Sequence, residues 1–166
     1  MQYKKETTST LHLICGLPGS GKTTLAKKIE KEKSAVRFAP DEWIKDIWGK
    51  TAETEGNTFR DQIEQLQWKI GKQILKSGTD VIIEWGTWGR DERDRLRTEA
   101  KSLGSDVKLY YLKADKEVLK ARIVERNKNL GDYEFRMPEE TLDEELDKAI
   151  VTFEVPTKEE MEEYDA

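Results

Sequence analysis

Eight residues near the start of the chain, Gly16-Leu17-Pro18-Gly19-Ser20-Gly21-Lys22-Thr23, combine three glycines with a lysine and two hydroxyl side chains. They match the phosphate-binding pattern G-x-x-x-x-G-K-[ST] in full. Glycines let backbone N–H groups approach a phosphate without an intervening Cβ, and a helix that begins at this point adds its partial positive charge. The pattern predicts that this loop binds ATP or GTP. The predicted nucleotide contacts are Gly16, Leu17, Pro18, Gly19, Ser20, Gly21, Lys22, Thr23 and Thr24.

Two side chains of this loop carry distinct chemistry. Lys22 is placed to reach the β- and γ-phosphates, and the Thr23 hydroxyl is placed to ligate a Mg²⁺ ion that bridges them. An apolar run over residues 10–15 precedes the loop, and an apolar stripe at helical spacing over residues 25–29 follows it, so the loop connects a buried strand to a helix. The competing interpretation is a glycine-rich turn with a surface lysine.

An acidic residue, Asp41, follows a second predicted strand over residues 35–39, which ends at Pro40. Ligands bind at the carboxyl ends of parallel strands. Asp41 is therefore the candidate catalytic base that accepts a proton from an attacking hydroxyl group. The alternative is an N-cap for a helix that begins near Glu42, and one carboxylate can serve both purposes.

Glu84 ends the apolar run Val81-Ile82-Ile83, as an acid that holds Mg²⁺ behind a nucleotide does in a Walker B arrangement. Glutamate is one methylene longer than the commoner aspartate, which favours contact with the metal through water, and a substrate-binding role is the alternative. Trp43 and Trp85 also follow strand ends. Their rings can stack a flat acceptor such as a base or a sugar, with core packing as the alternative.

Gly86 and Gly89 flank Thr87-Trp88, which indicates a tight turn close to another group. Arg90 or Arg93, just after this turn, can point at the donor or acceptor phosphate. For Arg93, pairing with nearby acids at the surface is an equally good interpretation. The predicted substrate contacts are Trp43, Glu84, Trp85, Arg90 and Arg136.

Arg122 and Arg126 are four residues apart on a predicted helix over residues 115–127, so they share one face. Two guanidinium groups on one face can neutralise the charge of a phosphoryl group during transfer, and we therefore count both as candidate catalytic residues with Asp41 and Lys22. The polar segment over residues 127–138 is predicted to be a lid. The alternative interpretation of the two arginines is a pair of solvated helix charges.

Apolar runs alternate with helical patterns along the whole chain, which predicts an α/β fold with a parallel sheet. The expected strands cover residues 10–15, 35–39, 80–84 and 107–112, and a fifth strand is not assigned. The expected helices after the first cover residues 41–48, 59–78, 90–102, 115–127 and 138–150. Residues 50–58 are predicted to form a mobile loop, and the acidic tail over residues 157–166 is predicted to be loosely held.

Composition restricts the possible classes of protein. At 166 residues the chain is predicted to be one domain, 1–166. Charged residues make up 38% and the net charge is −5, which disfavours binding of duplex nucleic acid. One cysteine and one histidine exclude a disulfide framework and argue against a zinc site. The polar start and the absence of a long apolar run predict a cytoplasmic protein without a membrane partner.

Several blocks of sequence together resemble one group, the P-loop small-molecule kinase-like proteins known as predicted kinases of the AAA-like ATP-binding type. These blocks cover nearly the whole chain and are GLPGSGKTTLA, APDEW, VIIEWGTWGRDERDRLR, YYLKADKEVLKARIVERN and FRMPEETLDEEL with FEVPT. The group is similar to gluconate kinase, chloramphenicol phosphotransferase, zeta toxin and the kinase domain of phage polynucleotide 5′-kinase. The resemblance implies a three-layer P-loop NTPase fold with a short parallel sheet of order 2-3-1-4, flanking helices and a helical lid.

The same resemblance implies an ATP-dependent kinase. In the relatives, the acid that matches Asp41 activates the acceptor hydroxyl, and arginines that match Arg122 or Arg126 reach over the phosphates. Polynucleotide kinase has a basic residue after its catalytic acid, where this chain has Trp43 and Ile44. The expected partners are therefore ATP (or GTP) with Mg²⁺ and a small-molecule hydroxyl acceptor, rather than nucleic acid. A polynucleotide 5′-hydroxyl kinase and a nucleotide-binding switch that hydrolyses ATP slowly or not at all are the alternatives.

Overall fold

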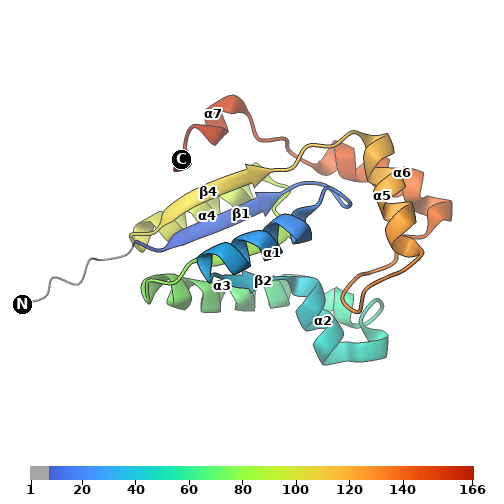
Figure 1. Cartoon of the computed structure of the whole chain (residues 1–166), viewed down its shortest axis with the longest axis horizontal. Helices are drawn as coiled ribbons and strands as arrows, with labels where there is room; N and C mark the ends of the chain where they lie inside the picture. The colour runs from blue at the N-terminus through green and yellow to red at the C-terminus, as the bar shows by residue number, and fades with distance from the viewer. Residues whose placement is uncertain (1–7) are drawn as a thin grey trace, which may run out of the picture.

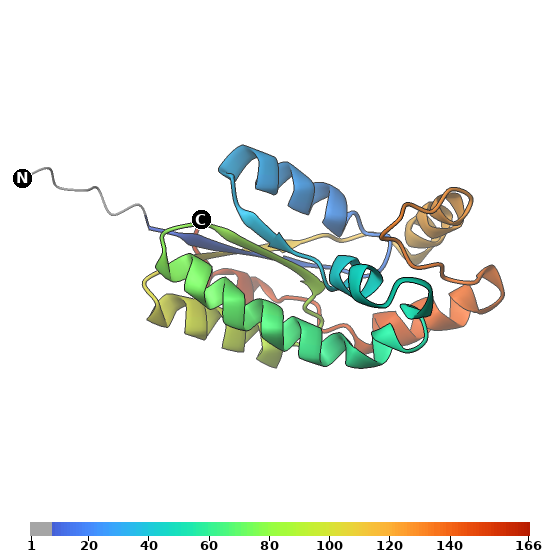
Figure 2. The same cartoon turned by 90° about the horizontal axis from the view of Figure 1, so that it is seen from below.

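A computed structural model describes residues 8–166 as three layers, with a parallel sheet between helices (Figures 1 and 2). The strand order β2-β3-β1-β4 and the α/β fold confirm the expectation from the sequence. The four strands of the sheet are β1 (Thr10–Cys15), β2 (Val36–Phe38), β3 (Val81–Gly86) and β4 (Asp106–Tyr111).

Helices cover both faces of this sheet, with α1 on one face and α3 and α4 on the other (Figure 2). The α-helices are α1 (Lys22–Lys33), α2 (Pro40–Trp48), α3 (Arg60–Lys76), α4 (Arg90–Ser102), α5 (Lys116–Asn127), α6 (Glu139–Thr152) and α7 (Lys158–Met161). Helices α5 and α6 pair with each other beyond the carboxyl ends of the strands (Figure 1). Within residues 8–166, none of these helices combines the length and the apolar character needed to cross a bilayer.

The position of β1 at the centre of the sheet explains why its residues form an apolar run. It pairs with β3 and with β4, and Leu11 lies opposite Val81 on one side and Val107 on the other. Leu11 packs among residues of α3 and α4, whereas Ile14 packs against α1. Both faces of the strand are therefore buried, and a continuous apolar run replaces the alternation typical of a half-exposed strand.

Local differences from the sequence prediction occur at helix ends. The predicted mobile loop over residues 50–58 contains two short 3₁₀ turns, η1 (Gly49–Thr51) and η2 (Gly56–Phe59). Helix α2 begins at Pro40 with Ala39 as its N-cap, so Asp41 lies in the first turn and does not cap the helix. Proline is well suited to the start of a helix because its missing N–H would lack a partner there.

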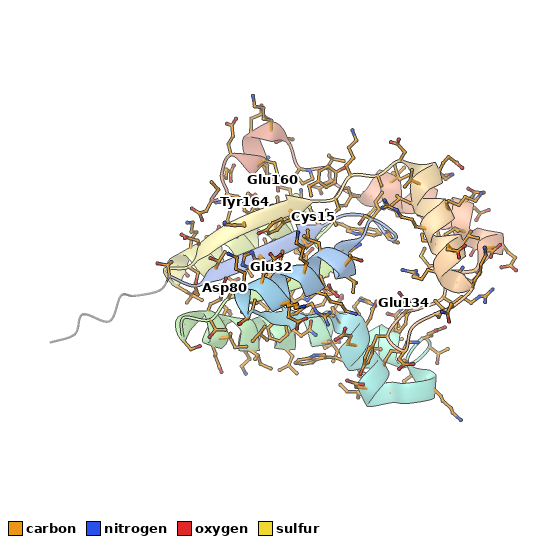
Figure 3. The ribbon with its side chains drawn as sticks, viewed as in Figure 1. Cys15, Glu32, Asp80, Glu134, Glu160 and Tyr164 are labelled. Carbon is orange, nitrogen blue, oxygen red and sulfur yellow. The ribbon has the colours of Figure 1, made fainter. Side chains whose placement is uncertain are left out.

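The acidic tail is packed against the domain, so the prediction that residues 157–166 are loosely held is wrong. Glu160 is 1% exposed and forms an ion pair with Arg93, which is 0% exposed. Further along, the backbone N–H of Asp165 donates to the carbonyl of Val107 at 2.8 Å. Figure 3 shows Glu160 and Tyr164 on this segment. The tail is held in place because Glu160, which lies on it, is the buried partner of the Arg93 guanidinium. Composition alone does not reveal this pairing.

Cys15 ends β1 in the interior and is 0% exposed. Burial raises the pKa of its thiol to about 11. Because the thiolate is the reactive form, we expect no alkylation of the native protein by iodoacetamide at pH 8 and one adduct in denaturant, measured by intact mass. Rapid labelling of the native protein would mean that the carboxyl end of β1 opens readily.

Candidate active site

A cavity of about 790 Å³ lies at the carboxyl ends of the strands, between the phosphate loop, α2 and the segment that joins α5 to α6. Ligands of parallel α/β sheets are expected at this edge, where the strands end. The cavity brings together most of the residues selected from the sequence, namely Pro18, Gly19, Gly21, Lys22, Thr23, Thr24, Asp41, Glu84, Trp85, Arg122 and Arg126.

The phosphate loop adopts a backbone that needs glycine. Gly19 and Gly21 have φ values of +80° and +96°. A Cβ on Gly19 would also lie 3.0 Å from the carbonyl oxygen of Leu119, so α5 packs directly on the loop. Helix α1 begins at Lys22, and its unsatisfied N–H groups point toward the same cavity. This arrangement is suited to binding an anion.

The Lys22 ammonium lies folded over the loop. It donates to the carbonyl oxygens of Gly16 and Leu17 at 3.0 and 2.9 Å. Burial lowers the pKa of Lys22 to about 8, and the charge of Glu84 opposes this shift. A partly desolvated ammonium gains from an anion in the cavity, so the charge is positioned for phosphate.

Thr23 and Glu84 supply oxygen atoms of the kind that Mg²⁺ prefers. The Thr23 hydroxyl lies 3.4 Å from Glu84 Oε1. The Glu84 side chain is 6% exposed; Oε1 also accepts from Arg37 at 3.1 Å, and Oε2 is buried without a partner among residues 8–166. Burial raises the pKa of Glu84 to about 7, although Arg37 opposes this shift. A hydroxyl and a carboxylate oxygen fit Mg²⁺, which usually takes its other ligands from phosphates and water.

Asp41 faces the same cavity and is held by Arg60, the first residue of α3. Arg60 Nη2 donates to Asp41 Oδ1, and Arg60 Nε donates to Asn57 Oδ1 at 3.1 Å. The Asp41 side chain is 43% exposed. The carboxylate is therefore oriented by a fixed guanidinium but accessible to a substrate.

Arg122 and Arg126 line the cavity opposite α2. Arg122 donates to the carbonyl of Gly19 at 3.3 Å, and Arg126 donates to the carbonyl of Phe135 at 3.4 Å. Arg122 thus contacts the phosphate loop, while Arg126 contacts the segment over residues 128–138. Both guanidinium groups are within reach of a phosphoryl group bound between these two elements.

The segment over residues 128–138 extends from α5 toward α2 and forms one wall of the cavity (Figures 1 and 3). Tyr133 donates to Asp46 Oδ1 at 2.9 Å, and the Lys45 ammonium lies 4.7 Å from the centre of the Phe135 ring. Glu134, also on this segment, is labelled in Figure 3. These contacts attach the segment to α2, which places it where a lid is expected.

Three predicted substrate contacts lie outside the cavity: Trp43, Arg90 and Arg136. Trp43 packs edge-on against Phe38, with ring centres 5.9 Å apart. Arg90 pairs with Asp94 and Glu163 on the opposite side of α4. The Arg136 side chain is exposed to solvent. These three positions therefore give no support for contact with an acceptor.

Arg93 occupies neither of the two positions predicted for it from the sequence, since it lies neither beside the phosphate loop nor at the surface. Its guanidinium donates to Glu160 and to the carbonyl oxygens of Thr87, Trp88 and Glu154. Arg93 therefore holds the turn after β3 and the C-terminal segment together beneath the cavity.

The cavity also contains residues that the sequence did not single out as site residues: Arg60, Glu64, Thr87 and Glu92. Arg60 and Glu64 are four residues apart on α3 and so share one face of that helix. Helical spacing shows which residues share a face, but it does not show that this face meets the ends of the strands. The glycines around Thr87 indicated a tight turn there, but no signal in the sequence identified Arg60, Glu64 or Glu92.

Comparison with known proteins agrees with the fold. The sequence profile of the AAA domain family matches residues 11–152. No curated protein matches the chain. The fold resembles a gluconokinase from Sinorhizobium meliloti, with 20% identity, a TM-score of 0.58 and coverage of 94% of this chain and 80% of that one.

Two further solved structures share the fold. A chain of the Pnkp1/Rnl/Hen1 RNA repair complex is 19% identical with a TM-score of 0.69, and the match covers 99% of this chain but 49% of that one. Kti12 from Chaetomium thermophilum, solved with ADP-AlF3, is 16% identical with a TM-score of 0.65 and coverage of 89% and 81%. Because the family profile spans most of the sequence, the chain belongs to the AAA domain family and is a P-loop kinase-like, ATP-binding domain.

Proposed function

We propose that this domain transfers the γ-phosphate of ATP to a hydroxyl group of a small molecule. The observation that supports the proposal is the cavity itself, in which Lys22 and Asp41 line one continuous space. A switch protein needs only the phosphate loop, whereas a kinase also needs an acceptor pocket with a base in it. Asp41 faces the cavity that Lys22 faces, which favours the kinase.

The proposed reaction assigns one task to each group. The acceptor oxygen attacks the γ-phosphorus, the bond to the β,γ-bridging oxygen breaks, and ADP leaves. Asp41 takes the proton of the acceptor hydroxyl. Lys22, Arg122 and Arg126 stabilise the negative charge on the phosphoryl oxygens. Thr23 and Glu84 would hold Mg²⁺, which supplies charge neutralisation between the β- and γ-phosphates when bound.

The surroundings of Asp41 favour a small molecule over a nucleic-acid end. The cavity wall next to Asp41 contains the carboxylates Glu64 and Glu92, whereas its nearest cation, Arg60, is already paired with Asp41. A polynucleotide acceptor needs cations for its backbone phosphates. Lys45, the first basic residue after Asp41 in the sequence, pairs with Glu53 at 3.5 Å.

The test is transfer of radiolabelled γ-phosphate from ATP with Mg²⁺ to a panel of sugars, nucleosides, antibiotics, nucleotide sugars and 5′-hydroxyl oligonucleotides. We expect label on one class of small molecule. Label on the oligonucleotides would support the polynucleotide kinase instead. Label released only as inorganic phosphate, or no release, would support the nucleotide-binding switch.

The lid arginines give a separate prediction. We expect Arg122→Ala and Arg126→Ala each to lower the rate of phosphate transfer by about 10²-fold, because each removes a donor to the transferring phosphoryl group. Lys128→Ala, an exposed cation on the same part of the chain that pairs with Glu125, is the matched control. Unchanged transfer rates in both arginine variants would show that they are ordinary surface charges.

A further inference from the structure

Two carboxylates face the active-site cavity from different helices, Glu64 on α3 and Glu92 on α4. Both also line a neighbouring hollow of about 330 Å³, and Trp85 lines both spaces. The Trp85 ring is fixed by a hydrogen bond from Nε1 to Gln67 Oε1 at 2.9 Å. An aromatic side chain of fixed orientation thus lines the same wall as two acids.

Neither acid has a hydrogen bond or an ion pair among residues 8–166, although both are only half-exposed. Glu99, farther along α4, shows the usual arrangement: it accepts from Trp68 Nε1 at 2.8 Å and from Lys72 Nζ at 3.0 Å. Carboxylates removed from water are normally paired. Burial raises the pKa of Glu64 to about 7, with the charge of Glu92 next in importance.

Most cations around the hollow are engaged elsewhere, and Lys69, which also lines it, forms no ion pair with either acid among residues 8–166. Arg60 pairs with Asp41, while Lys72 and Arg95 both pair with Glu99. The two acids therefore face the cavity without a bound cation from these neighbours. Like charges at such a position destabilise the protein unless a ligand compensates them.

A second observation in the same cavity also points to a ligand. Thr87 lines the cavity and is 2% exposed, and its Oγ1 has no partner among residues 8–166. Its φ of +39° is unusual for a β-branched residue. A buried hydroxyl normally finds a hydrogen-bond partner, so this one indicates a polar group supplied from outside the chain.

We propose that Glu64 and Glu92 form a subsite for a positively charged amino group of the phosphate acceptor, beside the Trp85 ring. The inference rests on the proposed kinase function and specifies its substrate class as an amine-bearing polyhydroxylated molecule, such as an amino sugar or an aminocyclitol. The ammonium group lies between the two carboxylates, and the ring of the acceptor packs against Trp85. The Thr87 hydroxyl bonds a polar group of the same acceptor.

The test compares amines with neutral partners of the same shape: glucosamine with glucose, and 2-deoxystreptamine with scyllo-inositol. Phosphate transfer and quenching of tryptophan fluorescence are both measured, because binding does not require turnover. We expect the wild-type protein to prefer each amine, and we expect Glu64→Gln with Glu92→Gln to reduce that preference by about 10- to 100-fold. Glutamine keeps the shape of the side chain and removes its charge.

Asp91→Asn is the matched control, because Asp91 is exposed, precedes Glu92 on α4 and does not line the cavity. It removes one negative charge from the same helix and is expected to keep the preference for amines. Loss of the preference in this variant would mean that the general acidity of the surface attracts the amine, which overturns the subsite.

The outcomes separate the subsite from the kinase function. Transfer to glucose or scyllo-inositol with no preference for the amines overturns the subsite and leaves the kinase in place. Amine binding that depends on Glu64 and Glu92, without transfer to any acceptor, supports the subsite and contradicts the kinase. If neither amine binds more tightly than its neutral partner, the subsite is overturned regardless of activity.

Discussion

Asp41→Asn is expected to lower the rate of phosphate transfer by about 10²- to 10⁴-fold, because the amide cannot accept the proton of the acceptor hydroxyl. The affinity for nucleotide is expected to be unchanged, since Asp41 lies on α2 and the predicted phosphate contacts lie on the loop before α1 and on the first turn of α1. The measurements are initial rates of transfer and titration with a fluorescent ATP analogue.

The arrangement around Asp41 decides how this result is interpreted. Arg60 donates to Asp41 Oδ1, and asparagine retains an oxygen that can accept the same hydrogen bond. The variant therefore tests proton transfer more than local structure. Loss of nucleotide binding in Asp41→Asn would contradict a role as base and would indicate a role in holding the metal instead.

Glu160→Ala is expected to lower the free energy of unfolding by about 3 to 5 kcal/mol, because it leaves the Arg93 guanidinium buried without its partner. Arg93 is 0% exposed and donates to both Glu160 oxygens, from Nε to Oε1 at 2.6 Å and from Nη2 to Oε2 at 3.0 Å. The loss is a large fraction of the roughly 5 to 15 kcal/mol that stabilises a typical domain. Urea denaturation followed by circular dichroism measures it.

The control is Glu163→Gln in the same segment. Glu163 pairs with Arg90 and Arg97, but its side chain is 38% exposed, so we expect a change of about 0 to 1 kcal/mol. A chain that ends before residue 157 should be destabilised at least as much as Glu160→Ala, because it also loses the contact between Asp165 and Val107. Equal denaturation midpoints for Glu160→Ala and Glu163→Gln would mean that the tail is dispensable.

Helix geometry explains why two residues that are close in the sequence point in different directions in the structure. Asp41 and Trp43 both follow β2, and the sequence placed both at the site. They are two residues apart on α2, and successive residues of an α-helix are about 100° apart, so the side chains point in nearly opposite directions. Asp41 therefore faces the cavity, while Trp43 packs against Phe38.

The nucleotide end of the candidate site could be predicted from the sequence alone, because its parts are contiguous or close along the chain. The loop from Gly16 to Thr23 is a single motif, and Glu84 follows a recognisable buried strand. Arg122 and Arg126 share a face by spacing alone. The α/β fold and the strand order likewise follow from alternating strand and helix patterns and from resemblance to a family.

The proposed acceptor end of the site depends on tertiary structure. Glu64 and Glu92 lie on separate helices, and they line one cavity only because α3 and α4 pack on the same face of the sheet. The pairing of Arg93 with Glu160 joins residues 67 positions apart. Charge patterns along a sequence do not reveal which acids are buried, because burial depends on packing between elements that are distant along the chain.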